Sequence, residues 1–213
     1  SPDERRIAYH SSQGGGAIAP FVKDLATGKE EQQVLPTEGL SVEDWTAGDF
    51  LVLRSFGRAV FRLPLTGARK LEQLVDTRYS EDQLQVSPDG EWIAFNSDES
   101  EAWEVWIARF PQCIEKRQVS IGGGVQPRWG PNGQELFYLA PDGTMMVLQR
   151  AGGGSSTFGA PRALFKTSLS PAAAELSEYD VTPDGQRFLI LEHTRDRPQV
   201  LTYLLNAVPG FNK

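Results

Sequence analysis

A short turn-and-strand unit recurs along the chain at nearly constant spacing. Its most regular copy spans residues 87–97, where the tetrapeptide Ser-Pro-Asp-Gly precedes the apolar run Trp-Ile-Ala-Phe. Proline presets φ to about −65°, aspartate can hydrogen-bond its own backbone, and glycine accepts positive φ, so the tetrapeptide predicts a tight turn. The apolar residues behind it are typical of a short β-strand. Each copy therefore predicts a turn that leads into a strand.

Related turns occur at four other places. The residues expected to form the regular turns are Pro2, Asp3, Pro88, Asp89, Gly90, Pro131, Gly133, Pro183, Asp184 and Gly185. A degenerate copy at residues 45–48 matches if one turn residue is deleted. Counted at Glu4, Gly48, Gly90, Gly133 and Gly185, the copies are separated by 44, 42, 43 and 52 residues. The longer last interval indicates an insertion at about residues 167–177.

This period indicates the fold class. Repeats of about 40 to 45 residues that contain strands are typical of β-propeller blades, one four-stranded sheet per repeat. Blade strands are covered on both faces, so apolar runs such as 50–53 and 188–191 need not alternate with polar residues. We therefore expect an all-β fold, a propeller of five four-stranded antiparallel blades in a single domain over 1–213. The repeats are expected at about 1–39, 40–78, 79–121, 122–168 and 169–213.

The strand patterns predict incomplete blades at both ends. The first repeat lacks its opening strand and the last lacks its closing strand, while the fourth strands of the first four repeats are expected at 32–35, 70–75, 117–119 and 161–165. An open strand edge is an aggregation hazard, and closed propellers protect their edges. The sequence therefore predicts either the C-terminal part of a longer propeller or a ring with irregular closure.

Charge and composition disfavour several classes of function. The chain has 21 Lys and Arg against 28 Asp and Glu, a net charge of −7, which argues against nucleic acid or an anionic membrane surface as the main partner. No window approaches the roughly 18 consecutive apolar residues of a membrane span, and no signal-peptide pattern is present. Membrane attachment is expected only through a segment upstream of this chain. The single cysteine, Cys113, cannot form an internal disulfide.

Acidic residues cluster at Asp98, Glu99 and Glu101, with Glu104 just beyond. A hard cation such as calcium binds several carboxylate and carbonyl oxygens. The ligand order and central glycine of an EF-hand are missing, which favours a solvated loop over a metal site. We expect no bound metal and no cofactor.

The histidines also give no sign of catalysis. His10 and His193 lie in the first and last repeats and belong to no metal-spaced pair or nucleophile motif. We expect a chain without enzymatic activity. A five-bladed glycosidase needs inward-facing carboxylates at defined separations, for which Asp44, Glu104 and Asp180 lie near expected strands.

Two repeats carry a family resemblance. The stretches S-P-D-G-E-W-I-A-F and T-P-D-G-Q-R-F-L-I, with the segment Q-P-R-W at 126–129, resemble the Pro-Asp repeats of TolB-type propellers. Residues 79–205 more closely resemble the C-terminal propeller half of bacterial membrane-linked serine/threonine kinases, in which G-G-G, P-R-W, L-F-Y, A-P-D-G and Y-D-V follow in the same order. The resemblance implies a non-catalytic interaction or sensing module on the outer side of the membrane, periplasmic or extracellular.

Two other functions stay open. One is the accessory propeller of a prolyl oligopeptidase-like hydrolase, which needs a fused α/β-hydrolase domain with a G-x-S-x-G turn; these residues contain none. The other is a five-bladed propeller that binds or hydrolyses glycosides.

The ligand is expected to be a protein or a small molecule, bound at the mouth of the central channel or on loops of the top face. Aromatic and arginine residues are the usual anchors of such contacts. Trp103, beside the acidic loop, and Arg128, beside a repeat turn, are therefore the expected binding residues. The alternatives are blade-to-blade core for Trp103 and a structural ion pair for Arg128.

Overall fold

The computed structural model describes residues 1–12, 17–33, 39–56, 59–76, 78–151, 157–169, 177–192 and 200–204. Within these ranges the chain forms 18 strands and no helix. In chain order the strands are β1 (Arg6–Ser11), β2 (Ala19–Asp24), β3 (Glu30–Gln32), β4 (Leu40–Trp45), β5 (Phe50–Ser55), β6 (Ala59–Pro64), β7 (Glu72–Asp76), β8 (Glu81–Val86), β9 (Trp92–Ser97), β10 (Glu104–Arg109), β11 (Ile114–Gln118), β12 (Val125–Trp129), β13 (Glu135–Leu139), β14 (Thr144–Gln149), β15 (Arg162–Lys166), β16 (Tyr179–Val181), β17 (Phe188–Glu192) and β18 (Val200–Leu204).

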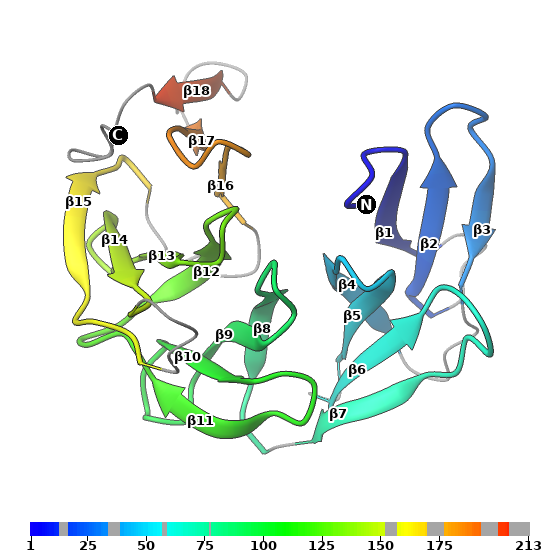
Figure 1. Cartoon of the computed structure of the whole chain (residues 1–213), viewed down its shortest axis with the longest axis horizontal. Helices are drawn as coiled ribbons and strands as arrows, with labels where there is room; N and C mark the ends of the chain where they lie inside the picture. The colour runs from blue at the N-terminus through cyan, green and yellow to red at the C-terminus, as the bar shows by residue number, and fades with distance from the viewer. Residues whose placement is uncertain are drawn as a thin grey trace.

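Consecutive strands pair into five antiparallel sheets. β1–β3 form blade 1, β4–β7 blade 2, β8–β11 blade 3, β12–β15 blade 4 and β16–β18 blade 5. Figure 1 shows the blades side by side around an axis, with β4, β8, β12 and β16 nearest the axis. We call these four the inner strands. The expected all-β propeller is confirmed, and blades 1 and 5 have three strands each.

The blades form an open arc (Figure 1). A gap separates blade 1 from blade 5, and no described strand of one is paired with a described strand of the other. Among the described residues, no helix has the length and apolar character that crossing a membrane requires.

The repeat turns lie where the sequence places them in four blades. The N–H of the fourth turn residue donates to the carbonyl of the first, as from Gly90 to Ser87 at 2.8 Å and from Gly185 to Thr182 at 2.8 Å. The side chain at the third place, an aspartate or in blade 4 Asn132, accepts the N–H two residues later, as Asp89 does from Glu91 at 3.0 Å. The fourth residue has positive φ in each turn, which explains the preference for glycine.

The turn of blade 2 differs from the sequence expectation. It spans residues 46–49, and the N–H of Asp49 donates to the carbonyl of Thr46 at 3.1 Å. The expectation that a residue is deleted and that Gly48 takes the glycine place is therefore wrong, because Asp49 takes this place with φ of 54°. Aspartate tolerates this conformation better than most residues, and its carboxylate is held by Trp45 Nε1 at 3.0 Å and Arg6 Nη2 at 3.1 Å.

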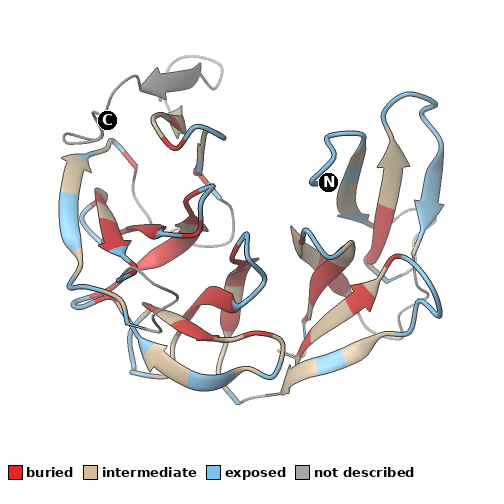
Figure 2. Cartoon of the chain, viewed as in Figure 1, coloured by how far each residue is buried: buried red, intermediate tan, exposed pale blue. Residues whose placement is uncertain are grey.

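Apolar side chains fill the spaces between blades. One cluster joins blades 3 and 4 and includes Trp92, Ile107, Trp129 and Tyr138. Similar clusters lie at the other junctions between neighbouring blades. Every residue of β9 and β13 is buried, whereas β3 at the perimeter is exposed throughout. Figure 2 shows the perimeter strands mostly tan and pale blue and the buried residues farther in. Burial on both faces explains why the middle strands read as unbroken apolar runs.

The positive φ of the fourth turn residue yields a stability prediction. Gly90→Ala should lower the free energy of unfolding by about 1–2 kcal/mol, because an L-residue is strained in the left-handed region. The φ of Gly90 is 72°, and no atom lies within 4 Å of the added Cβ, so no clash contributes. Glu4→Gly replaces an L-residue with glycine at the equivalent exposed position of blade 1. It relieves the same strain, so it should be neutral or stabilising. Urea denaturation measures both; an equal loss in the two variants would contradict this account of the turn.

Candidate functional site

A cavity of about 470 Å³ lies on the axis, bordered by blades 1 to 4 and by Ser177 just before blade 5. This volume falls within the range of about 300–1,000 Å³ that is usual for small-molecule sites. Polar side chains dominate its lining. The lining residues are His10, Ser41, Val42, Glu43, Arg54, Phe56, Asp82, Gln83, Arg128 and Ser177.

Bulges in the inner strands lie beside several of these side chains. The pairing register shifts between Val42 and Asp44 in β4, between Asp82 and Gln85 in β8, and between Val125 and Arg128 in β12. A bulge bends a strand and redirects its side chains, often beside functional sites. Gln83 and Gln126 lie in two of these bulges with φ of 55° and 58°.

Side chains of one inner strand satisfy the backbone of the next. Gln83 Oε1 accepts the N–H of Gln126 at 2.9 Å, and Gln126 Oε1 accepts the N–H of Glu178 at 2.8 Å. Asp44 Oδ2 accepts the N–H of Val86 at 2.8 Å in the same way. Inner-strand N–H groups lack a neighbouring strand on the axial side, and a buried unpaired N–H is costly.

A fourth bond of this kind joins Gln85 Oε1 to the N–H of Trp129 at 2.6 Å. We call the four bonds, made by Asp44, Gln83, Gln85 and Gln126, the inner-strand clamps. Blade 1 has no inner strand among the described residues, and there the N–H of Val42 donates instead to His10 Nδ1 at 3.2 Å.

Gln83 keeps one polar group unused. Gln83 is 7% exposed, and its Nε2 has no hydrogen-bond partner among the described residues. The corresponding Nε2 of Gln126 donates to Glu178 Oε2 at 3.1 Å. An unsatisfied buried amide costs free energy that a bound acceptor can recover. Gln83 therefore holds an unpaired donor in the wall of the axial cavity, where neighbouring atoms cover it.

Arg128 interrupts the clamp pattern. It lies two residues before the repeat turn of blade 4. At the equivalent positions of blades 2 and 3, Asp44 and Gln85 provide acceptors for the next blade, but a guanidinium has no acceptor. Its Nη1 donates to the carbonyl of Pro127 at 3.2 Å and its Nη2 donates to Ser177 Oγ. In the part of the chain that the structure describes, no carboxylate lies within ion-pair distance of Arg128, so the alternative of a structural ion pair is not realised there.

The other arginine of the cavity is neutralised. Arg54 lies 2.8 Å from Asp82 Oδ1 through Nη2 and 3.4 Å from Glu43 Oε1 through Nε. Two carboxylates thus share one guanidinium on the side of blades 2 and 3. The cavity therefore has an acidic side that Arg54 compensates in part and, at Arg128 in blade 4, a cation that forms no ion pair with the described residues.

Asp44 is held in the clamp between blades 2 and 3. Its Oδ1 accepts the N–H of Trp45 at 2.8 Å in addition to the clamp bond. Desolvation raises the pKa of Asp44 to about 6, although the hydrogen bond from Val86 and the charge of Arg128 oppose the rise.

Trp103 lies in a different place from Arg128. It borders a cavity of about 380 Å³ with residues 122–124, Leu139 and Pro141, and it packs against the apolar cluster of blades 4 and 5. The structure therefore does not bring the two expected binding residues into one site. Beside Trp103, the buried Glu104 accepts hydrogen bonds from the N–H of Gly123 at 2.8 Å and from Ser120 Oγ.

The acidic loop is engaged with its own chain. Asp98 Oδ1 accepts the N–H of Ser80 at 2.9 Å, and Glu99 pairs with Lys116. Among the described residues, no group of three or more His, Cys, Asp or Glu side chains is arranged to hold a metal ion. The weak metal candidates Asp98, Glu99 and Glu101 thus do not converge.

The remaining sequence candidates are dispersed. Glu104 and Asp180 line different cavities, so the three carboxylates considered for glycoside hydrolysis do not share one. His193 lies outside the described residues, as do residues 170–176 of the insertion.

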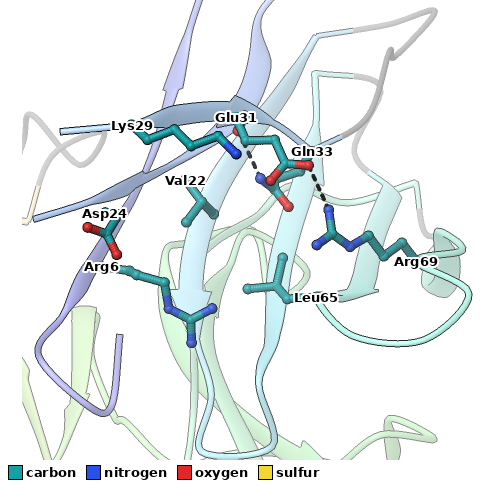
Figure 3. Close-up of a pocket in the computed structure, with 8 residues that line it drawn as sticks. All are labelled: Arg6, Val22, Asp24, Lys29, Glu31, Gln33, Leu65 and Arg69. Carbon is teal, nitrogen blue, oxygen red and sulfur yellow. Dashed lines mark hydrogen bonds and ion pairs between the residues drawn. The ribbon is translucent and has the colours of Figure 1, made fainter. Parts of the chain in front are cut away.

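A smaller cavity of about 130 Å³ lies between blade 1 and the loop after β6 (Figure 3). Several of its polar groups are paired within the chain: Arg69 Nη1 lies 2.9 Å from Glu31 Oε1, and Gln33 Nε2 donates to the carbonyl of Glu31 at 2.8 Å. Its small volume and paired groups make it a poor ligand site compared with the axial cavity.

Sequence reasoning missed Gln83, Arg54, Asp82 and Phe56 as lining residues. One signal was available for the glutamine, because Gln83 and Gln126 each stand four residues before the first residue of a repeat turn. A polar residue at a fixed distance from a turn, within an apolar strand, indicates a repeated structural bond.

Known structures share this architecture. TolB from Acinetobacter baumannii superposes with a TM-score of 0.72 at 14% identity, over 94% of this chain and 50% of that one. The fold is a TolB-like β-propeller. A putative TolB from Agrobacterium tumefaciens gives a TM-score of 0.62 at 19% identity, over 78% of this chain and 62% of that one. This chain therefore spans one half to about three fifths of the length of these two TolB-like propeller proteins.

A peptidase is also similar in structure. The puromycin-hydrolyzing peptidase of Mycobacterium tuberculosis gives a TM-score of 0.62 at 12% identity, over 88% of this chain and 33% of that one. No protein-family model and no curated protein matches the sequence.

The raised pKa of Asp44 yields a pH prediction. A carboxyl group whose pKa is higher in the folded state stabilises the fold when the pH is below its pKa in the unfolded chain, 3.8. This stabilisation is lost as the pH rises through about 6. Relative to Asp44→Asn, the wild type should gain about 2 kcal/mol of unfolding free energy between pH ~7 and pH ~4. Denaturant titrations across this range measure the difference, with Asp180→Asn as the control for removal of one exposed charge. A difference that does not change with pH would contradict the desolvation of Asp44 in the clamp.

Trp103 is half-buried, which predicts an intermediate effect of its removal. Trp103→Ala should lower the free energy of unfolding by about 1–2 kcal/mol, because part of the indole packs on the cluster of blades 4 and 5. Trp129→Ala, at a residue that is 5% exposed, should cost about 3–5 kcal/mol. Urea denaturation of both variants tests this, and equal losses would place Trp103 in the core.

Proposed function

We propose that this chain is a non-catalytic β-propeller module that binds a protein segment or a small ligand in the axial cavity. The observation that carries the proposal is the meeting of Gln83 Nε2, which is unpaired, and Arg128, which has only neutral acceptors, at one cavity. Ligand sites typically combine a concave surface with a few placed polar groups of this kind.

The way in which these groups are held supports the proposal. Gln83 is fixed by its clamp bond to Gln126, and Arg128 is fixed by Pro127 and Ser177. A side chain that is ordered before binding loses less conformational entropy when a ligand arrives. The axial cavity is therefore a preorganised site.

We also propose a location outside the cytoplasm and a role in sensing or interaction. Support comes from the resemblance of the Pro-Asp repeats to TolB-type propellers and to the propeller half of membrane-linked kinases. In such an arrangement the propeller supplies recognition, and any chemistry belongs to another domain.

A second candidate is the accessory propeller of a hydrolase. The likeness to part of the puromycin-hydrolyzing peptidase favours it, because this chain aligns with 33% of that protein. The parent reading frame discriminates between the two candidates. A hydrolase domain with a G-x-S-x-G turn supports the second, and a kinase domain with a membrane span supports the first.

A bulky residue in the axial cavity tests the site itself. Ser177 is exposed and lines the cavity, so Ser177→Trp should fill it at little cost in stability. A thermal-shift panel of monosaccharides, monocarboxylic acids, their amides and short peptides, at millimolar concentration, should contain members that raise the melting temperature of the wild type. Ser177→Trp should abolish these shifts.

Two controls accompany this variant. Ser177→Ala removes the hydroxyl without adding bulk, and Thr66→Trp adds an indole at an exposed turn after β6, away from the axis. Thr66→Trp should retain the shifts. Ser177→Ala also removes the acceptor of Arg128 Nη2, so its shifts should become smaller without disappearing. Binding that survives in Ser177→Trp, or a panel without any shift, would count against the axial cavity as the ligand site.

A further inference from the structure

We propose that the ligand of the axial cavity carries one carboxylate, bound between Arg128 and Gln83, and an apolar remainder that packs on Phe56. This inference rests on the function proposed above and names the class of ligand for the same site. Three observations support the inference: the donors that the chain leaves unused, the charge balance of the cavity and an exposed aromatic ring at the border of the cavity.

The unused donors favour an anionic acceptor. The guanidinium of Arg128 has five N–H groups, and the described structure occupies two of its nitrogens with neutral oxygens. The Nε2 of Gln83, in a residue that is 7% exposed, has no partner. Neighbouring atoms cover this nitrogen, so a ligand oxygen reaches it by displacing them. A carboxylate has two oxygens and can accept from both groups, and hydrogen bonds to an ionised partner are the stronger kind.

The charge balance limits the ligand to one carboxylate. Glu43 and Asp82 share Arg54, so the side of the cavity formed by blades 2 and 3 retains net negative charge. A second carboxylate placed there would be repelled by these two groups. The remainder of the ligand should therefore be uncharged.

Phe56 gives that remainder an apolar surface. It lines the cavity directly after β5 and is 59% exposed, although large apolar side chains are usually covered. Gly39 makes room for the ring, since a Cβ at that position would lie 2.4 Å from Phe56 Cδ2. The N–H of Phe56 donates to the carbonyl of Gly39 at 3.3 Å, which holds the two residues together.

A free small acid and the C-terminus of a peptide share this chemistry. Two matched pairs of probes separate them. The first pair is phenylacetate with phenylacetamide, and the second is acetyl-Ala-Phe with its C-terminal amide. In each pair the carboxylate is replaced by a neutral group of the same shape.

Isothermal titration calorimetry of the chain with these probes tests the inference. In at least one pair the acid should bind about 10- to 100-fold more tightly than the amide, the range expected for charge-assisted hydrogen bonds. Preference in the first pair alone indicates a small acid, and preference in the second pair indicates a peptide C-terminus. Succinate should bind more weakly than phenylacetate because it adds a second charge and lacks the ring.

Variants assign the effect to the named residues. Arg128→Gln should reduce the preference for the acid to about twofold or less, because the cation is lost. Gln83→Glu keeps the oxygen that bonds to Gln126 but replaces the free amide nitrogen with a second oxygen, so it should weaken the acid and spare the amide. Arg162→Gln removes the same charge from an exposed residue of β15 and should leave both affinities unchanged.

The outcomes separate this inference from the function on which it rests. Equal affinity for acid and amide, with both abolished by Ser177→Trp, would overturn the carboxylate assignment and leave the axial cavity as a binding site. An acid preference that survives in Arg128→Gln would also overturn it. Absence of binding by all four probes would overturn the inference as well, and the broader ligand panel then decides on the cavity.

Discussion

The inner-strand clamps are the interactions on which the axial region depends. An inner strand has a neighbouring strand on one side and the axis on the other. Its N–H groups on the axial side therefore need partners that no sheet provides. Asp44, Gln83, Gln85 and Gln126 supply these partners across the junctions between blades. The apolar clusters bring neighbouring blades together without direction, whereas the clamps fix the register of each blade against the next. From blade 2 to blade 5, the placement of the inner strands at the axis depends on this coupling.

The candidate site arises where the repeated pattern is broken. Gln126 uses its whole amide in the clamp, since Glu178 takes the nitrogen, but Gln83 uses only its oxygen. Two residues before the turn, Arg128 replaces an acceptor with a cation. Natural sequences tend to violate their own structural rules at functional sites. Both residues line one cavity, although Arg128 also borders the cavity beside Asp180. This coincidence distinguishes the axial cavity from those beside Trp103 and Arg69.

Spacing predicted the blades well because each turn has a strict backbone requirement that its residues meet. The outermost strands were harder, because exposure removes the apolar signal: β11 (Ile114–Gln118) begins before the expected 117–119, and β3 (Glu30–Gln32) barely overlaps the expected 32–35. The sequence pattern misplaces the turn of blade 2 by one residue, because its fourth position is expected to be glycine and is occupied by Asp49. Arg128 could be anticipated from its place in the motif. The free donor of Gln83 could not, because it depends on partners in other blades that sequence order does not reveal.

A crystal structure grown in the presence of phenylacetate tests the central claim most directly, since it shows the occupant and the clamps together. The account predicts a carboxylate within hydrogen-bonding distance of both Arg128 and Gln83 Nε2, the phenyl ring against Phe56, and Gln83 Oε1 still bonded to the N–H of Gln126. An axial cavity that holds only water, with Arg128 turned to a carboxylate of its own chain, would contradict it.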